Sequence, residues 1–126
     1  MNGRILNLPG VIILLLMVGF AAVAWAHSFP DEQSPSAGAT LSEPPAQVTI
    51  KYDAPIEKLF ASLEVLNSAG QNQAAGKPQV SDDGWKLSVP LNKLSPGEYT
   101  VQWSVVCIDT HRTQGSYSFM VGGPRS

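Results

Sequence analysis

Only two histidines occur among the 126 residues, and both stand where a side chain could bind a metal ion. His111 follows Asp109 by two residues, in the run CIDTH. If strand geometry persists through this run, the two-residue period directs both side chains to the same side. An imidazole nitrogen and a carboxylate oxygen are two ligands that a divalent cation accepts. The run is therefore a candidate metal site.

The other histidine, His27, follows a stretch that has the three parts of a secretory signal peptide. Arg4 supplies the positive charge, residues 11–23 are almost wholly apolar, and the sequence AWA places small residues at the −3 and −1 positions of a cleavage site. The apolar run is shorter than the about 20 residues that a membrane-spanning helix needs. We therefore expect residues 1–26 to be a cleaved signal peptide and residues 27–126 to be one exported domain.

A histidine at the N-terminus offers a metal ion two nitrogens. Its α-amine has an ordinary pKa of about 7.7–8.0, so it gives up its proton to a metal near neutral pH. The amine and the ring Nδ1 of His27 can close a six-membered chelate, to which His111 would add a nitrogen and Asp109 an oxygen. Three nitrogens and one oxygen in a square arrangement suit Cu(II), which also leads the divalent affinity order. Zinc is the competitor, although it prefers tetrahedral geometry.

The spacing alone leaves simpler explanations open. Some residue must follow a cleavage site, so a histidine there can be chance, and Asp109 could merely cap a turn. Cys107, the single cysteine, shares strand parity with Trp103 and Val105, so burial as a small hydrophobic side chain is expected. A role for Cys107 as a Cu(I) or redox ligand is motivated only by its closeness to Asp109.

The elements that must position these residues are short β-strands. Alternation of apolar and polar side chains predicts strands near residues 48–52, 60–66, 85–89, 99–107 and 115–121. The proline-rich residues 28–46 are expected to be extended or turning chain, and residues 67–84 a long loop with at most one short strand. Trp85 and Trp103 are expected in the core, and Tyr99 to make a corner hydrogen bond. This pattern predicts an all-β fold, an antiparallel β-sandwich.

Composition excludes some classes of function. The chain has 8 Lys and Arg against 10 Asp and Glu, and without Arg4 the net charge is near −3. No basic patch is visible, so nucleic acid is not an expected partner. One cysteine allows no internal disulfide, so an exported domain of this kind must be stabilised by a packed core.

Several segments also occur together in a known pattern. They are the histidine directly after the signal, SPSAGATL at 34–41, LSPGEYTVQW at 94–103, VVCIDTH at 105–111 and GSYSFMV at 115–121. In this order and over nearly the full exported chain, they resemble the CopC family of periplasmic copper-binding proteins. The resemblance implies an immunoglobulin-like β-sandwich or Greek-key barrel of about seven strands, with Cu(II) bound by His27, Asp109 and His111.

The resemblance further implies a periplasmic protein, not an enzyme, that serves copper homeostasis, resistance or delivery, with an inner-membrane copper transporter of the CopD type as the partner. Two other functions stay open. One is a copper monooxygenase with an N-terminal histidine chelate, which needs an open coordination position and a broad substrate surface. The other is a metal-free β-sandwich interaction module.

Two departures from the family pattern change what is expected of the site. Residues 67–84 contain neither Met nor His, so a second site for Cu(I), which selects soft ligands, is not expected. Ala54 stands where the family has an acidic residue near the metal, and Asp53 or Glu57 could take over its role.

Overall fold

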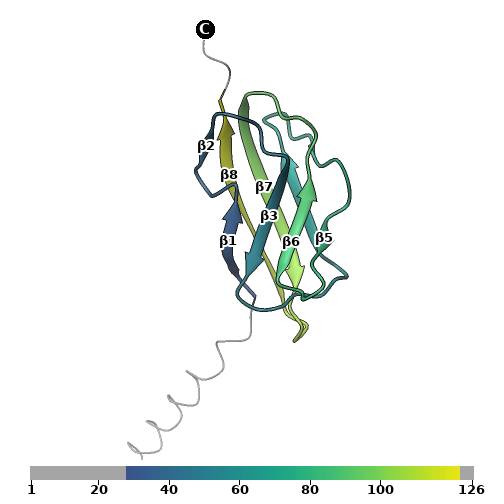
Figure 1. Cartoon of the computed structure of the whole chain (residues 1–126). Coiled ribbons are helices and arrows are strands. Elements are labelled where there is room, and N and C mark those ends of the chain that lie inside the picture. Colours follow the sequence, from purple (N-terminus) through teal and green to yellow (C-terminus); the bar gives the residue numbers. More distant parts are fainter. Residues whose placement is uncertain (1–27, 123–126) are drawn as a thin grey trace, which may run out of the picture.

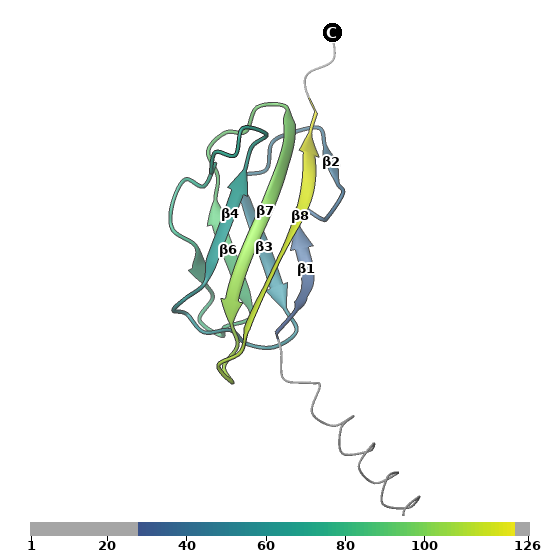
Figure 2. The ribbon, with the colours of Figure 1, turned by 180° about the vertical axis from the view of Figure 1, so that it is seen from behind.

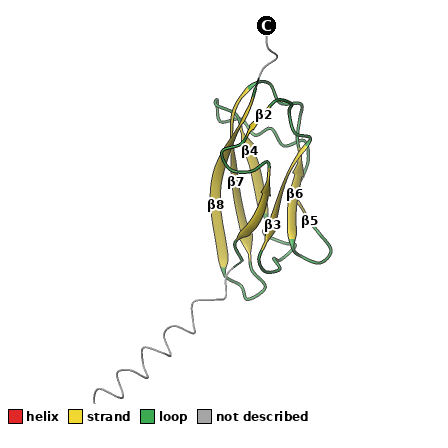
Figure 3. Cartoon of the chain, turned by 60° about the vertical axis from the view of Figure 1, so that its left-hand side comes forward, coloured by secondary structure: helices red, strands yellow, loops and turns green. Residues whose placement is uncertain are grey.

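Two four-stranded β-sheets pack face to face in the computed structural model, which describes residues 28–122 (Figure 3). One sheet has the strand order β1-β3-β6-β5 and the other the order β2-β8-β7-β4. Every pairing is antiparallel except that of β2 with β8. The strands are β1 Pro30–Ser34, β2 Thr40–Leu41, β3 Gln47–Tyr52, β4 Ser62–Leu66, β5 Gln79–Val80, β6 Lys86–Pro90, β7 Gly97–Val106 and β8 Arg112–Val121.

The predicted all-β sandwich is confirmed, with eight strands in the described part instead of about seven. Within residues 28–122 there is no helix, and so none long and apolar enough to cross a membrane. The expected short strand between residues 67 and 84 is β5. Residues 28–46, expected as extended or turning chain, contain β1 and β2. These two strands are defined by their backbone pairing, because their sequences do not alternate between apolar and polar residues.

The core lies between the sheets and is built from the alternating apolar residues of β3, β4, β6, β7 and β8. Tyr52 of one sheet meets Trp103 of the other edge to face, with ring centroids 5.5 Å apart. Gly115 makes room for that indole, because a Cβ there would stand 2.8 Å from the Trp103 ring. Trp85 was expected in the core, but it precedes β6 at the end of the sheet and is 36% exposed.

The two ends of the sandwich differ in what they bring together (Figures 1 and 2). The turn between β7 and β8 lies at the same end as the start of β1 and the end of β3. The opposite end holds the start of β7, where the Tyr99 hydroxyl donates the predicted corner hydrogen bond to the Ser95 carbonyl at 2.5 Å. The candidate ligands Asp109 and His111 are therefore close to the start of the described chain.

Candidate metal centre

The turn from Cys107 to His111 positions the two candidate ligands. The Cys107 amide donates to the His111 carbonyl at 2.7 Å, and the Thr110 amide donates to the Cys107 carbonyl at 2.9 Å. Thr110 has φ +76°, a left-handed conformation that is costly for a β-branched residue. Two backbone hydrogen bonds thus close a tight turn at the end of the long β7–β8 hairpin.

Asp109 and His111 point toward each other from this turn. Asp109 Oδ2 lies 3.2 Å from His111 Nδ1, and the His111 amide donates to Asp109 Oδ1 at 3.3 Å. The side chains are 37% and 59% exposed, so an ion can reach both. Their predicted closeness is confirmed, although its cause differs. β7 ends at Val106, and the turn, not strand alternation, brings the two side chains together.

The third predicted ligand, His27, lies outside the described residues. Its neighbour Ser28 is fully buried against the same turn. The Ser28 amide donates to Cys107 Sγ at 2.8 Å, and the Ser28 carbonyl accepts from Thr113 Oγ1 at 2.8 Å. The Ser28 hydroxyl donates to the Pro55 carbonyl at 3.3 Å. No local sequence pattern predicts the contacts with Cys107 and Thr113, because these residues lie 79 and 85 positions from Ser28 in the sequence.

The carboxylate of Asp53 accepts a hydrogen bond from the backbone of Phe29, the residue that follows Ser28. Asp53 Oδ1 accepts from the Phe29 amide at 2.8 Å, and the Asp53 amide donates to the Phe29 carbonyl at 2.9 Å. Glu57 joins this end by its backbone, since its amide donates to the Val106 carbonyl at 2.8 Å. Of the two residues proposed to replace the missing acid, Asp53 is thus the one whose carboxylate contacts the segment next to His27.

The chemistry of the available donors favours Cu(II) or Zn(II) over Cu(I). Asp109 and His111 offer oxygen and nitrogen, whereas Cu(I) selects soft sulfur ligands. Cys107, predicted to be buried, is 3% exposed, and its sulfur accepts the Ser28 amide. No cluster of three or more His, Cys, Asp or Glu side chains occurs within residues 28–122.

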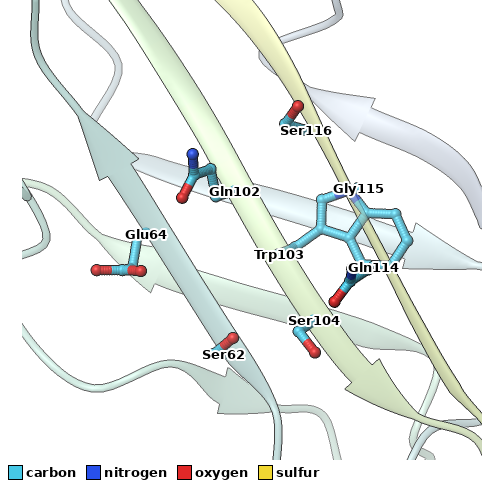
Figure 4. Close-up of a pocket in the computed structure, with 8 residues that line it drawn as sticks. All are labelled: Ser62, Glu64, Gln102, Trp103, Ser104, Gln114, Gly115 and Ser116. Atoms are coloured by element: carbon cyan, nitrogen blue, oxygen red, sulfur yellow. The ribbon is translucent and has the colours of Figure 1, made fainter. Parts of the chain in front are cut away.

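A broad, shallow hollow lies away from this pair, on the outer face of β4, β7 and β8 (Figure 4). Its lining is mostly polar: Ser62, Glu64, Gln102, Trp103, Ser104, Gln114, Gly115 and Ser116. Trp103, the aromatic residue of this lining, is only 6% exposed, because its ring lies against Gly115. The accessible lining of this hollow is therefore mainly polar.

Residues 31–122 match the CopC domain family model. The chain belongs to the CopC family. Copper resistance protein C of Xanthomonas campestris pv. juglandis is 36% identical over 111 residues, which cover 80% of this chain and 84% of that protein. The copper transport protein CutJ of Bacillus subtilis (strain 168) is 31% identical over 114 residues, which cover 89% of this chain but 21% of CutJ.

A solved structure of CopC from Methylosinus trichosporium OB3b has the same fold, with a TM-score of 0.73 and 27% identity, covering 79% of this chain and 98% of that one. The predicted family is thereby confirmed. This CopC domain is a copper-related protein of a resistance and transport family.

Proposed function

We propose that this CopC domain is an exported protein that holds one Cu(II) through His27, Asp109 and His111. It would serve copper homeostasis, resistance or delivery in the periplasm and would not catalyse a reaction. The observation that carries the proposal is the paired Asp109 carboxylate and His111 imidazole, 3.2 Å apart and accessible, beside the buried Ser28.

Covalent geometry supports His27 as the remaining ligand. Consecutive Cα atoms are about 3.8 Å apart, so the position at which Ser28 is held matters for any ligand that the preceding residue supplies. The Ser28 amide, which is bonded to the His27 carbonyl carbon, lies 2.8 Å from the sulfur of Cys107. Cys107 precedes Asp109 by two residues in the same turn. Ser28, the residue that follows His27, is thus held by the segment that contains the other two proposed ligands, which supports His27 as the third.

Cleavage after Ala26 is the step that would create the amine ligand. In the uncut chain the His27 nitrogen is an amide, which has no lone pair to offer a metal at neutral pH. The proposed signal peptide, residues 1–26, thus links export to assembly of the site. Copper would be bound only after the chain has left the cytoplasm.

Delivery to a membrane transporter of the CopD type is the finer part of the proposal. Leu59, Phe60 and Ile108 are large apolar side chains that are exposed. Leu59 and Ile108 line one hollow with Pro55 and Gly84, and Ile108 belongs to the turn from Cys107 to His111, here called the metal turn. Exposed apolar groups beside a metal site are suited to contact with a protein that takes up the ion. The match to one fifth of CutJ supports this, because there the domain is part of a longer transport protein.

Electron paramagnetic resonance of bound Cu(II) tests the site directly. Two preparations are compared, one beginning at His27 and one with a single extra residue before it. The first should show one Cu(II) with mainly nitrogen coordination, and the second a different spectrum and a weaker affinity, since an amide replaces the amine. Identical spectra from the two preparations would overturn the proposed ligand set. Equilibrium dialysis without stoichiometric Cu(II) binding would overturn the function as well.

A further inference from the structure

Cys107 and Thr113 lie on either side of the candidate ligands Asp109 and His111 in the sequence, and both hold the same residue, Ser28. Cys107 precedes Asp109 by two positions, and Thr113 follows His111 by two. The sulfur of Cys107 accepts the Ser28 amide, and the hydroxyl of Thr113 donates to the Ser28 carbonyl, each at 2.8 Å. The segment 107–113 therefore contains two candidate ligands, Asp109 and His111. It also contains the two groups that bind Ser28, the neighbour of the third candidate ligand.

Burial makes these two contacts important. Ser28 and Thr113 are the buried polar residues among positions 28–122, and Cys107 is 3% exposed. A buried amide or carbonyl without a partner is costly, so Ser28 can occupy this position only while both contacts are made. The Ser28 hydroxyl adds a contact to Pro55, but a hydroxyl can rotate and does not orient the backbone.

We propose that Cys107 and Thr113 are positioning residues, which fix the Ser28 backbone beside Asp109 and His111 and so favour metal binding by His27 together with these two residues. The proposal rests on the proposed function. Ser28 is then already fixed by folding, which lowers the conformational entropy that is lost when copper binds. Cys107 acts here as a hydrogen-bond acceptor toward the backbone and not as a copper ligand.

Two substitutions at Thr113 distinguish the effect of the hydroxyl group from the effect of side-chain volume. Thr113→Val keeps the shape and removes the donor to Ser28, whereas Thr113→Ser keeps the donor. The matched control is Thr100→Val, at the other end of the β7–β8 pair, where Thr100 Oγ1 lies 3.4 Å from Ser118 Oγ. Metal affinity is measured by chelator competition on chains beginning at His27, together with the thermal midpoint of the metal-free proteins.

Thr113→Val should weaken Cu(II) binding by roughly 10-fold or more, the usual effect of removing a group that orients a ligand. It should also change the Cu(II) resonance spectrum. Thr113→Ser should restore both properties, and Thr100→Val should alter neither, even if it lowers the thermal midpoint as much. Unchanged affinity and spectrum in Thr113→Val would overturn the positioning role.

Hydrogen exchange of the metal-free protein supplies a test that needs no copper. The Ser28 amide should exchange slowly in the wild type and at least about 10-fold faster in Cys107→Ala, which removes its acceptor. Fast exchange of Ser28 in the wild type would refute the Cys107 contact, even if Thr113→Val does not fold. If the wild type shows no His27-dependent Cu(II) binding, the proposed function fails. If it shows such binding and only the Thr113 and Cys107 effects are missing, the positioning role alone fails.

Discussion

Two acidic turns lie at the same end of the sandwich, one between β5 and β6 and one between β7 and β8. A single segment joins them, since the Ile56 amide donates to the Gly84 carbonyl and the Glu57 amide to the Val106 carbonyl, each at 2.8 Å. Both turns contain an aspartate and a residue with positive φ. Asp83 of the first turn and Asp109 of the second nevertheless have different environments.

Asp83 directs its carboxylate to its own turn. Its Oδ1 accepts from the Ser81 hydroxyl at 2.6 Å and from the Trp85 amide at 3.1 Å. The Ser81 hydrogen bond, followed by that of the Trp85 amide, lowers the pKa of Asp83. Gly84 supplies the left-handed backbone, with φ +80°, at little cost. This is the simple turn-capping role that sequence reasoning left open for Asp109.

Asp109 divides its oxygens between the turn and a neighbouring side chain. Oδ1 accepts the His111 amide, while Oδ2 faces the His111 imidazole. The left-handed position is taken by Thr110, not by glycine. Backbone strain of this kind persists where the surroundings fix the conformation, and it is concentrated at functional sites. In the β5–β6 turn the Asp83 carboxylate accepts hydrogen bonds from within its own turn. The β7–β8 turn instead places a carboxylate and an imidazole side by side.

The largest expected effect is the difference in Cu(II) affinity between two variants that carry the same Asp→Asn substitution, one in each turn. Asp109→Asn removes the charge of the proposed oxygen ligand and should weaken Cu(II) binding by about 10- to 100-fold or more, because loss of an orienting neighbour alone has effects of that size. Asp83→Asn should leave the affinity unchanged. Chelator competition measures both variants. Equal loss of affinity in the two would mean that the turns do not differ in function.

Gly84→Ala should be the more destabilising of two glycine substitutions. Its φ is +80°, and an added Cβ would stand 3.2 Å from the Ile56 carbonyl oxygen and 3.3 Å from Pro55 Cβ. We expect a loss of about 2–3 kcal/mol in the free energy of unfolding, from strain and crowding together. Gly70→Ala has the same φ and open space, so it should cost only about 1 kcal/mol. Urea unfolding measures both, and equal losses would exclude the contact with residues 55 and 56.

Thr110→Gly should stabilise the fold while loosening the metal turn. Relief of left-handed strain outweighs the added chain entropy by about 0.5–1 kcal/mol. Cu(II) affinity should fall slightly, since the turn is less restricted. Thr110→Asn, which tolerates this conformation, is the control and should keep the affinity. A lower free energy of unfolding for Thr110→Gly in urea would show that the turn is unstrained.

The smallest effect is a pH dependence at Asp83. Because its pKa is lower in the folded protein than the ordinary 3.8, the ionised carboxylate adds stability above that value. This contribution is lost as the pH falls through the lowered folded-state pKa. The thermal midpoints of wild type and Asp83→Asn should therefore differ more at about pH 7 than at about pH 2. A difference that does not change with pH would contradict the carboxylate hydrogen bonds.

Local pattern predicted the inner strands and the closeness of Asp109 and His111, whose role as metal ligands stays a prediction. Alternation located β3, β4, β6, β7 and β8, because each buries one face against the opposite sheet. Alternation could not locate β1, because its residues are mostly polar and are held by backbone pairing with β3. It also could not predict that Trp85, at the end of a sheet, is exposed. The burial of Ser28 depends on partners distant in sequence, so no local pattern contains it.

The direction of β8 has a practical consequence. The strand starts at Arg112, beside the metal turn, and ends at Val121, at the opposite end of the sandwich (Figure 1). A linker attached after Val121 would thus anchor the protein to an electrode or a resin with the proposed copper site facing the solution. Attachment ahead of His27 would instead block the amine. Oriented coupling through the C-terminal side is therefore the suitable design for a copper-sensing surface.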